Sequence, residues 1–291
     1  MVGCGVRIPF PQIFFCDLDG TLLDEDGTIC PDSRRVLLEL VERGTRVILA
    51  SGRLPGDMKE SCEALGLEGP QITMNGALLC SPVTGETLLE RSMDSATVHE
   101  QLRFALEHDV PAVFAYADGH RTQHLSFPVG ATFGVHLPVE VPDIEALAAS
   151  QPLKTYLLAG SERYGEILSE AQTVFAGRNA VTSSGQDVII ELLQLDANKG
   201  YAAKTLSSRL GVPMSHVAAA GDSMNDVEIL RACPVSIAMH EAPDFVRAAS
   251  TYIAPPRSEG GLAAALEQLF RIHSGSTPRK RRIYEARQRC L

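Results

Sequence analysis

Two aspartates separated by one residue, Asp17 and Asp19, follow a run of four apolar residues at 13–16. Such a run is typical of a strand buried inside a parallel sheet. Open parallel sheets bind ligands at the carboxyl ends of their strands, which is where this pair falls. Two carboxylates so close together repel each other unless a cation lies between them. The other interpretation is a polar turn with Asp19-Gly20 as turn residues, and the local sequence leaves both open.

A second acidic pair stands at the end of another apolar run. Asp222 follows residues 217–220, and Asp226 opens the next helix beside Asn225. Carboxylate oxygens suit Mg²⁺, an ion that keeps several waters and is often shared with a phosphate. The two pairs together therefore predict a magnesium site.

Lys199 and Ser51 offer groups that hold anions. Lys199 lies near the start of a helix whose predicted N-cap is Asp196. A cation opposes the helix dipole there, so it is better placed where an anion binds nearby; the alternative is a surface lysine. Ser51 adds a hydroxyl donor at a strand end, which completes a set able to hold a phosphoryl group.

The elements that must position these residues alternate between strands and helices. The predicted strands of this part are 13–16, 45–50, 71–74, 217–220, 235–238 and 251–253, with helices starting near residues 31, 58, 199, 225, 242 and 262. Polar residues stand at the carboxyl ends of the strands. This pattern predicts a doubly wound, Rossmann-like α/β core with a parallel sheet.

The alternation stops in the middle of the chain. Residues 93–192 show helices at 98–108 and 162–175 and strands at 113–116, 154–159, 181–183 and 188–192, with an irregular stretch rich in Gly and Pro between them. We expect an α+β cap domain at 93–192, inserted into a catalytic core of 1–92 and 193–273. A basic C-terminal tail follows at 274–291, and we interpret it as a solvated end.

Composition narrows the class of protein. The formal charge of −10 argues against nucleic acid as a general partner. No apolar run is long enough to span a membrane and the chain start lacks the pattern of a leader, so we expect a cytoplasmic location. The seven cysteines contain no Cys-x-x-Cys, which argues against a zinc or disulfide framework. Cys16, beside Asp17, is interpreted as a buried strand residue rather than a nucleophile.

Four motifs occur in a fixed order: Asp-Leu-Asp-Gly-Thr at 17–21, Ser-Gly-Arg at 51–53, Lys-Gly at 199–200 and Gly-Asp-Ser-Met-Asn-Asp at 221–226. In this order the sequence resembles the haloacid dehalogenase superfamily of phosphohydrolases. It is most similar to the Cof-type branch, whose α+β cap lies between the second and third motifs. The resemblance covers the chain apart from its first residues and the basic tail.

The resemblance implies a role for each motif residue. Asp17 is the implied nucleophile, which forms an aspartyl-phosphate, and Asp19 the implied general acid and base. The resemblance implies that Mg²⁺ is held by the Asp17 carboxylate, the Asp19 carbonyl and Asp222, with Asp226 in the outer shell. The implied phosphate-binding residues are Ser51, Gly52, Lys199 and Asn225.

Two positions depart from the family pattern. His240-Glu241 stands where the family usually shows Gly-Asn, and Arg257 replaces a usual Asn. Because glycine permits a tight loop, we expect the first loop to be reshaped. The four motifs themselves are intact.

The cap offers fewer clear candidates. We select His120, His124 and Glu191 as candidate substrate contacts; further polar residues there are Arg121, His136, Ser183 and Ser184. The alternative for the histidines is surface or interdomain packing.

We therefore expect a Mg²⁺-dependent phosphatase that hydrolyses a small phosphorylated metabolite such as a sugar phosphate. A phosphomutase of the same superfamily and a non-catalytic metabolite-binding protein on the same fold stay open as alternatives. Dehalogenation is disfavoured because it requires neither Asp19 nor Mg²⁺. No membrane partner is expected, and the sequence identifies neither the substrate nor the oligomeric state.

Overall fold

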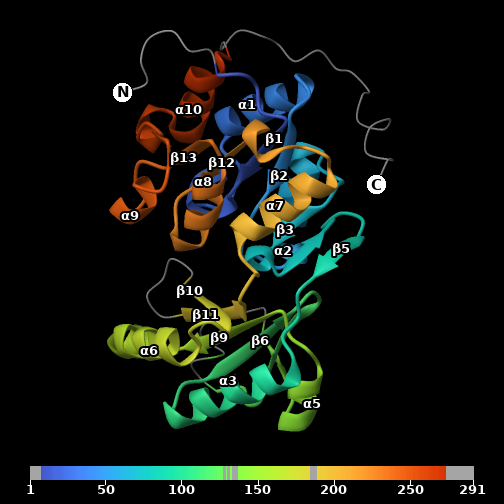
Figure 1. Ribbon diagram of the computed structural model, residues 1–291, viewed down its shortest axis with the longest axis vertical. Helices are drawn as coiled ribbons and strands as arrows, with labels where there is room; N and C mark the ends of the chain where they lie inside the picture. The colour runs from blue at the N-terminus through green and yellow to red at the C-terminus, as the bar shows by residue number, and fades with distance from the viewer. Residues whose placement is uncertain (1–7, 127–128, 130–131, 133–136, 184–188, 273–291) are drawn as a thin grey trace.

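The computed structural model describes residues 8–126, 129, 132, 137–183 and 189–272. Figure 1 shows two bodies: the upper one contains both ends of the described chain, and the lower one contains its middle. The basic tail expected at 274–291 lies outside the described residues, as do His136 and Ser184.

The upper body is built on a five-stranded parallel sheet with the order β14-β13-β12-β1-β2. Its strands are β1 (Ile13–Cys16), β2 (Arg46–Leu49), β12 (Val217–Gly221), β13 (Val235–Ala238) and β14 (Tyr252–Ile253). In the register of β1 with β12, Cys16 lies opposite Ala220, so both strands end at the same edge of the sheet. The residues that follow these two strands are therefore brought together.

Helices cover both faces of this sheet (Figure 1). They are α1 (Pro31–Glu42), α2 (Pro55–Leu65), α7 (Lys199–Arg209), α8 (Val227–Ala232), α9 (Asp244–Arg247) and α10 (Gly261–Phe270). Phe14 packs in one apolar cluster with α1, α2 and α10, whereas Phe15 packs in a second cluster with α7, α8 and α9. Burial on both faces explains why β1 is apolar throughout. The predicted doubly wound α/β fold is confirmed.

The third predicted strand pairs mainly outside the parallel sheet. β3 (Gln71–Thr73), β4 (Leu78–Cys80) and β5 (Thr87–Glu90) form a separate antiparallel sheet. A parallel bridge between Ala50 and Ile72 connects β3 to the end of the main sheet. The turn after β3 therefore still reaches the edge where β1 and β12 end.

The lower body is a six-stranded sheet with the order β10-β11-β9-β6-β7-β8. Its strands are β6 (Ala112–Tyr116), β7 (Gly119–Thr122), β8 (Val139–Glu140), β9 (Lys154–Leu158), β10 (Asn179–Ser183) and β11 (Ile189–Gln194), and its helices are α3 (Ser95–Glu107), α5 (Ile144–Ala149) and α6 (Gly160–Val174). Phe114, Leu157 and Ile190 pack against these helices. Because side chains alternate along a strand, Lys154, Tyr156 and Glu191 belong to the opposite face.

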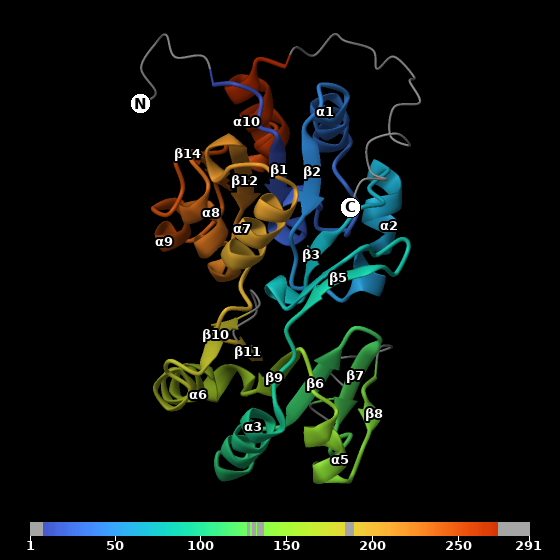
Figure 2. The same ribbon diagram turned by 45° about the vertical axis from the view of Figure 1, so that its right-hand side comes forward.

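That opposite face is turned toward the upper body. Ala115 and Leu193 of the lower sheet share an apolar cluster with Met74, Leu78 and Cys80 of the upper body. Figure 2 shows the two places where the chain passes between the bodies, after β5 and after β11. The expected boundary at 92/93 lies between β5 and α3, and the one at 192/193 lies within β11.

Three elements of the lower body were not predicted. β7, β8 and α5 lie in the stretch that was expected to be irregular. β7 has the sequence Gly-His-Arg-Thr and β8 only two residues, so neither has the apolar alternation that marks a strand. Their pairing with β6 and with each other supplies what the local sequence lacks. Among the described helices, none is long and apolar enough to cross a membrane.

Candidate active site

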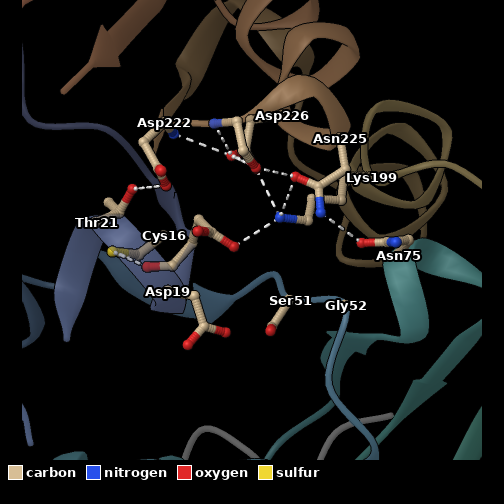
Figure 3. Close-up of polar contacts among 12 residues, drawn as sticks. Cys16, Asp19, Thr21, Ser51, Gly52, Asn75, Lys199, Asp222, Asn225 and Asp226 are labelled. Carbon is tan, nitrogen blue, oxygen red and sulfur yellow. Dashed lines mark hydrogen bonds and ion pairs between the residues drawn. The ribbon is translucent and has the colours of Figure 1, made fainter. Parts of the chain in front are cut away.

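Three carboxylates meet where β1 and β12 end. Asp17, Asp222 and Asp226 each offer an oxygen, and these oxygens lie within 4.8 Å of one another. Asp17 and Asp226 are buried, and Asp222 is partly buried. Figure 3 shows Asp222 and Asp226 in the segment after β12, above Cys16 at the end of β1. The predicted meeting of these aspartates is therefore present in the structure.

Lys199 lies among these carboxylates and is fully buried. Its Nζ donates to Asp17 Oδ1 at 2.6 Å and to Asp226 Oδ1 at 2.6 Å (Figure 3). It is thus no surface lysine. A buried ammonium needs such partners, because its desolvation would otherwise remain uncompensated.

The capping residue predicted for this helix is wrong. The N-cap of α7 is Asn198, whose side chain accepts from the backbone N–H of Tyr201. Asp196 lies before the helix and forms an ion pair with Arg91. Asparagine and aspartate are about equally good N-caps, so the sequence alone does not choose between positions 196 and 198.

Burial and charge shift the proton affinity of this group. Burial, reinforced by the charge of Asp226, holds the pKa of Asp17 well above its usual value. Burial and Asp226 likewise raise the pKa of Asp222 to about 6, against the lowering effect of the Thr21 hydroxyl. Burial alone would lower the pKa of Lys199, but the charges of Asp17 and Asp226 outweigh it and raise that pKa. Asp17 and Asp222 are therefore unfavourable places for two uncompensated negative charges, although Lys199 lies beside them.

The donor set fits a hard divalent cation. Carboxylate oxygens are the ligands that Mg²⁺ prefers. Both oxygens of Asp226 are already engaged: Oδ1 accepts from Lys199, and Oδ2 accepts from the backbone N–H groups of Asp222 and Ser223 at 3.0 Å. Asp17 and Asp222 are therefore better placed to bind the ion directly, and Asp226 to support them.

Asp19 lies apart from the three carboxylates. Its two oxygens accept from Arg53, with Nε at 2.9 Å and Nη2 at 2.6 Å, and its side chain is 59% exposed. Figure 3 shows its carboxylate pointing away from Asp222. The expected repulsion within Asp17-x-Asp19 is thus relieved by separation and by an arginine. In the sequence, Arg53 was noted only as the last residue of the Ser-Gly-Arg motif, without a role of its own.

Ser51 and Gly52 follow β2, and Figure 3 shows them on the same side of the site as Asp19. Ser51 is buried, and its hydroxyl accepts from the N–H of Arg53 at 3.2 Å. The carbonyl of Gly52 accepts from Lys154 of the lower body at 3.0 Å. The second motif is therefore held from both bodies.

Asn75 is a residue of this site that the sequence prediction did not assign. It is buried in the turn after β3, where Met74, Asn75 and Gly76 all have positive φ. Gly76 is required there, because a Cβ would lie 2.6 Å from the carbonyl oxygen of Asn198. Asn75 Oδ1 accepts from Asn225 at 2.9 Å, and its Nδ2 donates to Glu191 at 2.5 Å. The Asn-Gly turn at a strand end was the available signal.

The three cap candidates occupy different surroundings. Glu191 is buried, and Lys154 lies 3.1 Å from its Oε1. The ring of His120 lies 5.6 Å from that of Tyr156, whereas His124 is exposed and its nearest ion-pair partner is Glu140 at 3.9 Å. Among the described residues, hydrogen bonds therefore connect Glu191, but not His124, to the carboxylate group.

The two departures from the family pattern contact each other. Glu241 Oε1 accepts from the backbone N–H of Arg257 at 3.1 Å, and Arg257 donates to the carbonyl of Leu23 at 3.1 Å. The loop at His240-Glu241 is therefore tied to the segment that carries the other substitution. Cys16 is fully buried, which raises the pKa of its thiol and excludes it as a nucleophile.

A cavity of 430 Å³ adjoins this site between the two bodies. Its lining includes Asn75, Asn198, Lys199, Asn225 and Phe245 from the upper body and Ala180, Thr182 and Leu193 from the lower one. A small organic molecule fits a space of this size.

Comparison with known proteins identifies the family. The chain is 26% identical over 255 residues to a 5-amino-6-(5-phospho-D-ribitylamino)uracil phosphatase of Bacillus subtilis, covering 88% of this chain and 94% of the relative. It is 29% identical over 229 residues to an HMP-PP phosphatase of Serratia proteamaculans, covering 78% and 82%. A phosphatase structure from Bacteroides thetaiotaomicron superposes with a TM-score of 0.79 at 20% identity, covering 94% of this chain and 99% of that one. The profile of the haloacid dehalogenase-like hydrolases matches residues 14–266, so the chain belongs to this family of hydrolases, as its four motifs predict.

Proposed function

We propose that this hydrolase is a Mg²⁺-dependent phosphatase that acts on a small phosphorylated metabolite through an aspartyl-phosphate on Asp17. The observation that carries the proposal is the buried ion pair of Lys199 with Asp17, beside Asp222. A carboxylate nucleophile and a cation at one strand edge are what phosphoryl transfer requires, since catalysis there consists mainly of positioning and charge stabilisation.

Each residue has a defined task in this proposal. Asp17 attacks phosphorus with the carboxylate oxygen that faces the substrate, and Lys199 faces the phosphoryl oxygens from the side. Ser51 and the N–H of Gly52 hold the other oxygens. Mg²⁺, held by Asp17 and Asp222, would supply positive charge against the transferring group. Water then hydrolyses the aspartyl-phosphate and regenerates Asp17.

Asp19 is the proposed general acid and base, but its carboxylate is paired with Arg53 in the structure. To protonate the leaving oxygen and later accept a proton from water, its carboxylate must face the substrate. The pair with Arg53 must therefore open or turn during the reaction. Both side chains are partly exposed, so this movement breaks no buried contact.

The substrate class is proposed from the relatives and the cavity. Of the two relatives named above, one is a phosphatase for a uracil that carries a phosphorylated ribitylamino group, and the other is an HMP-PP phosphatase. The cavity beside Asn75 and Lys199 accommodates an organic leaving group of that size or a sugar. A cytoplasmic location is also proposed, because the five described cysteines are free thiols.

The test measures phosphate release by the purified full chain with Mg²⁺, using a panel of phosphorylated metabolites and p-nitrophenyl phosphate. Asp17→Asn should lower turnover by at least about 10³-fold, because the covalent route is lost. Asp32→Asn is the control, since that carboxylate is exposed and outside the site. A folded Asp17→Asn protein that releases phosphate at the wild-type rate would refute the mechanism. Transfer of the phosphoryl group within the substrate, without release, would identify a mutase instead.

A further inference from the structure

A continuous series of side-chain hydrogen bonds runs from the lower body to the proposed nucleophile. Asn75 Nδ2 donates to Glu191 Oε2 at 2.5 Å, and Asn225 Nδ2 donates to Asn75 Oδ1 at 2.9 Å. Lys199 Nζ lies 3.2 Å from Asn225 Oδ1 and 2.6 Å from Asp17 Oδ1. Figure 3 shows the part of this series from Asn75 to Lys199. The series joins four segments of the upper body to β11.

The two ends of the series fix the orientation of the amides between them. A carboxylate accepts hydrogen bonds only, and an ammonium donates only. Asn75 must therefore present its NH₂ to Glu191, which leaves its oxygen to accept from Asn225. Asn225 in turn presents its oxygen to Lys199, and Ser223 Oγ donates to the same oxygen at 2.7 Å. If the acceptor at position 191 were lost, the NH₂ of Asn75 would have no acceptor there, and the amides would be directed from the Lys199 end only.

A second contact from the lower body reaches the phosphate-binding turn. Lys154 Nζ lies 3.1 Å from Glu191 Oε1 and donates to the carbonyl of Gly52 at 3.0 Å. The backbone N–H of Asn75 donates to the carbonyl of Ser51 at 3.0 Å. Lys154 and Glu191 are both buried, so water replaces neither the contact of Lys154 with Glu191 nor its hydrogen bond to Gly52. Both oxygens of Glu191 are thus occupied by protein donors.

We infer that Glu191 is a positioning residue: through Asn75 and Asn225 it orients Lys199 against Asp17. The inference rests on the proposed function, which gives Lys199 and Asp17 their roles. It assigns the inserted segment a part in catalysis itself, whereas the sequence predicted only a substrate contact for Glu191. A misdirected amide next to Lys199 displaces the ammonium from the position at which it serves phosphoryl transfer.

Exchanging the carboxylate and the amide between positions 191 and 75 tests this inference. Glu191→Gln sets an amide NH₂ against that of Asn75, and Asn75→Asp sets two carboxylates against each other. In the double variant the new amide at position 191 would donate to the new carboxylate at position 75, which still accepts from Asn225, and the net charge equals that of the wild type. Each single variant should lose about 10- to 100-fold in kcat/KM for p-nitrophenyl phosphate. The double variant should return to within about three-fold of the wild type.

A second readout separates positioning from a merely structural role. Orthovanadate imitates the five-coordinate phosphoryl group, so its inhibition constant should rise in each single variant by the factor that kcat/KM loses. Asn179→Ala is the matched control: Asn179 is buried in the same body and donates to the carbonyl of Leu193 at 2.9 Å, outside the series. Its turnover per folded molecule should equal that of the wild type.

Two outcomes overturn the inference. One is wild-type turnover in the folded single variants, and the other is a double variant as impaired as the singles. If Glu191→Gln fails to fold, Asn75→Gly replaces it, because glycine keeps the positive φ of 58° and removes only the amide. Unchanged turnover in Asn75→Gly would then overturn the inference. An active Asp17→Asn protein would instead refute the proposed function, whatever the Glu191 variants do.

Discussion

Because Gly20 has no side chain, the Asp222 carboxylate can lie close to it, and a substitution at Gly20 therefore probes the proposed metal site. Its φ is +77°, and a Cβ on it would lie 2.2 Å from Asp222 Oδ2 and 2.5 Å from Cγ. To reach an ordinary contact of 3.4 Å, the carboxylate would have to move by about 1.2 Å. Such a shift also breaks the bond that Thr21 Oγ1 donates to Asp222 at 2.9 Å. Gly20→Ala should therefore displace a proposed Mg²⁺ ligand without changing it chemically.

Gly27→Ala is the matched control. Gly27 has a φ of +80°, and no atom lies within 4 Å of the place where its Cβ would be. Both substitutions should cost about 1–2 kcal/mol in unfolding free energy, because both place an L side chain in the left-handed region. Only Gly20→Ala should lose a further ~1 kcal/mol, for the Thr21 bond, and at least about ten-fold in Mg²⁺ affinity.

Thermal unfolding in rising Mg²⁺ concentration measures both quantities. A ligand that binds the folded state raises the melting temperature according to its affinity, so each variant gives a dissociation constant without any substrate. Turnover of p-nitrophenyl phosphate at saturating Mg²⁺ adds the catalytic consequence. If Gly20→Ala binds Mg²⁺ as Gly27→Ala does and is equally stable, the reasoning about Asp222 is wrong.

Three further predictions follow from the charges of the site. Lys199→Met should lower the free energy of unfolding by about 3–5 kcal/mol, because two buried carboxylates lose their partner. Arg53→Ala breaks an exposed pair and should lower it by less than about 1 kcal/mol. Urea unfolding compares the two variants, and equal losses would contradict the assignment. The pKa of Asp222 is raised to about 6, so between pH 4 and 6 the folded metal-free protein holds a proton that the unfolded chain has released. Its free energy of unfolding, compared with that of Asp222→Asn, should therefore fall by up to about 3 kcal/mol as the pH rises from 4 through 6. Excess Mg²⁺ should reverse this trend, and a relative stability that rises over that pH range would contradict it. His124→Ala should leave the turnover of p-nitrophenyl phosphate unchanged, because the only described ion pair of His124 is the one with Glu140, outside the site. A loss of turnover above about ten-fold would place His124 in the site.

The sequence by itself determined the five strands of the parallel sheet and the positions of the carboxylates that follow two of them. β1 is buried on both faces, so its residues had to be apolar in an unbroken run, and the first polar residue after it had to lie at the sheet edge. The same reasoning located Asp222 after β12. These signals are local, because the apolar pattern of a strand and the place where it ends are read within a few residues.

The sequence predicted that Asp17 and Asp222 meet, but only the tertiary structure decided the other partners of the site residues. Asp17 and Asp19 are two residues apart, yet one is buried against Lys199 and the other pairs with Arg53 in solvent. Asn75 and Glu191 are separated by 116 positions, and nothing near either residue indicates the other. The short strands β7 and β8 likewise formed where the local sequence lacks apolar alternation. Contacts of this kind depend on how two bodies pack, and packing is a property of the whole chain rather than of any segment of it.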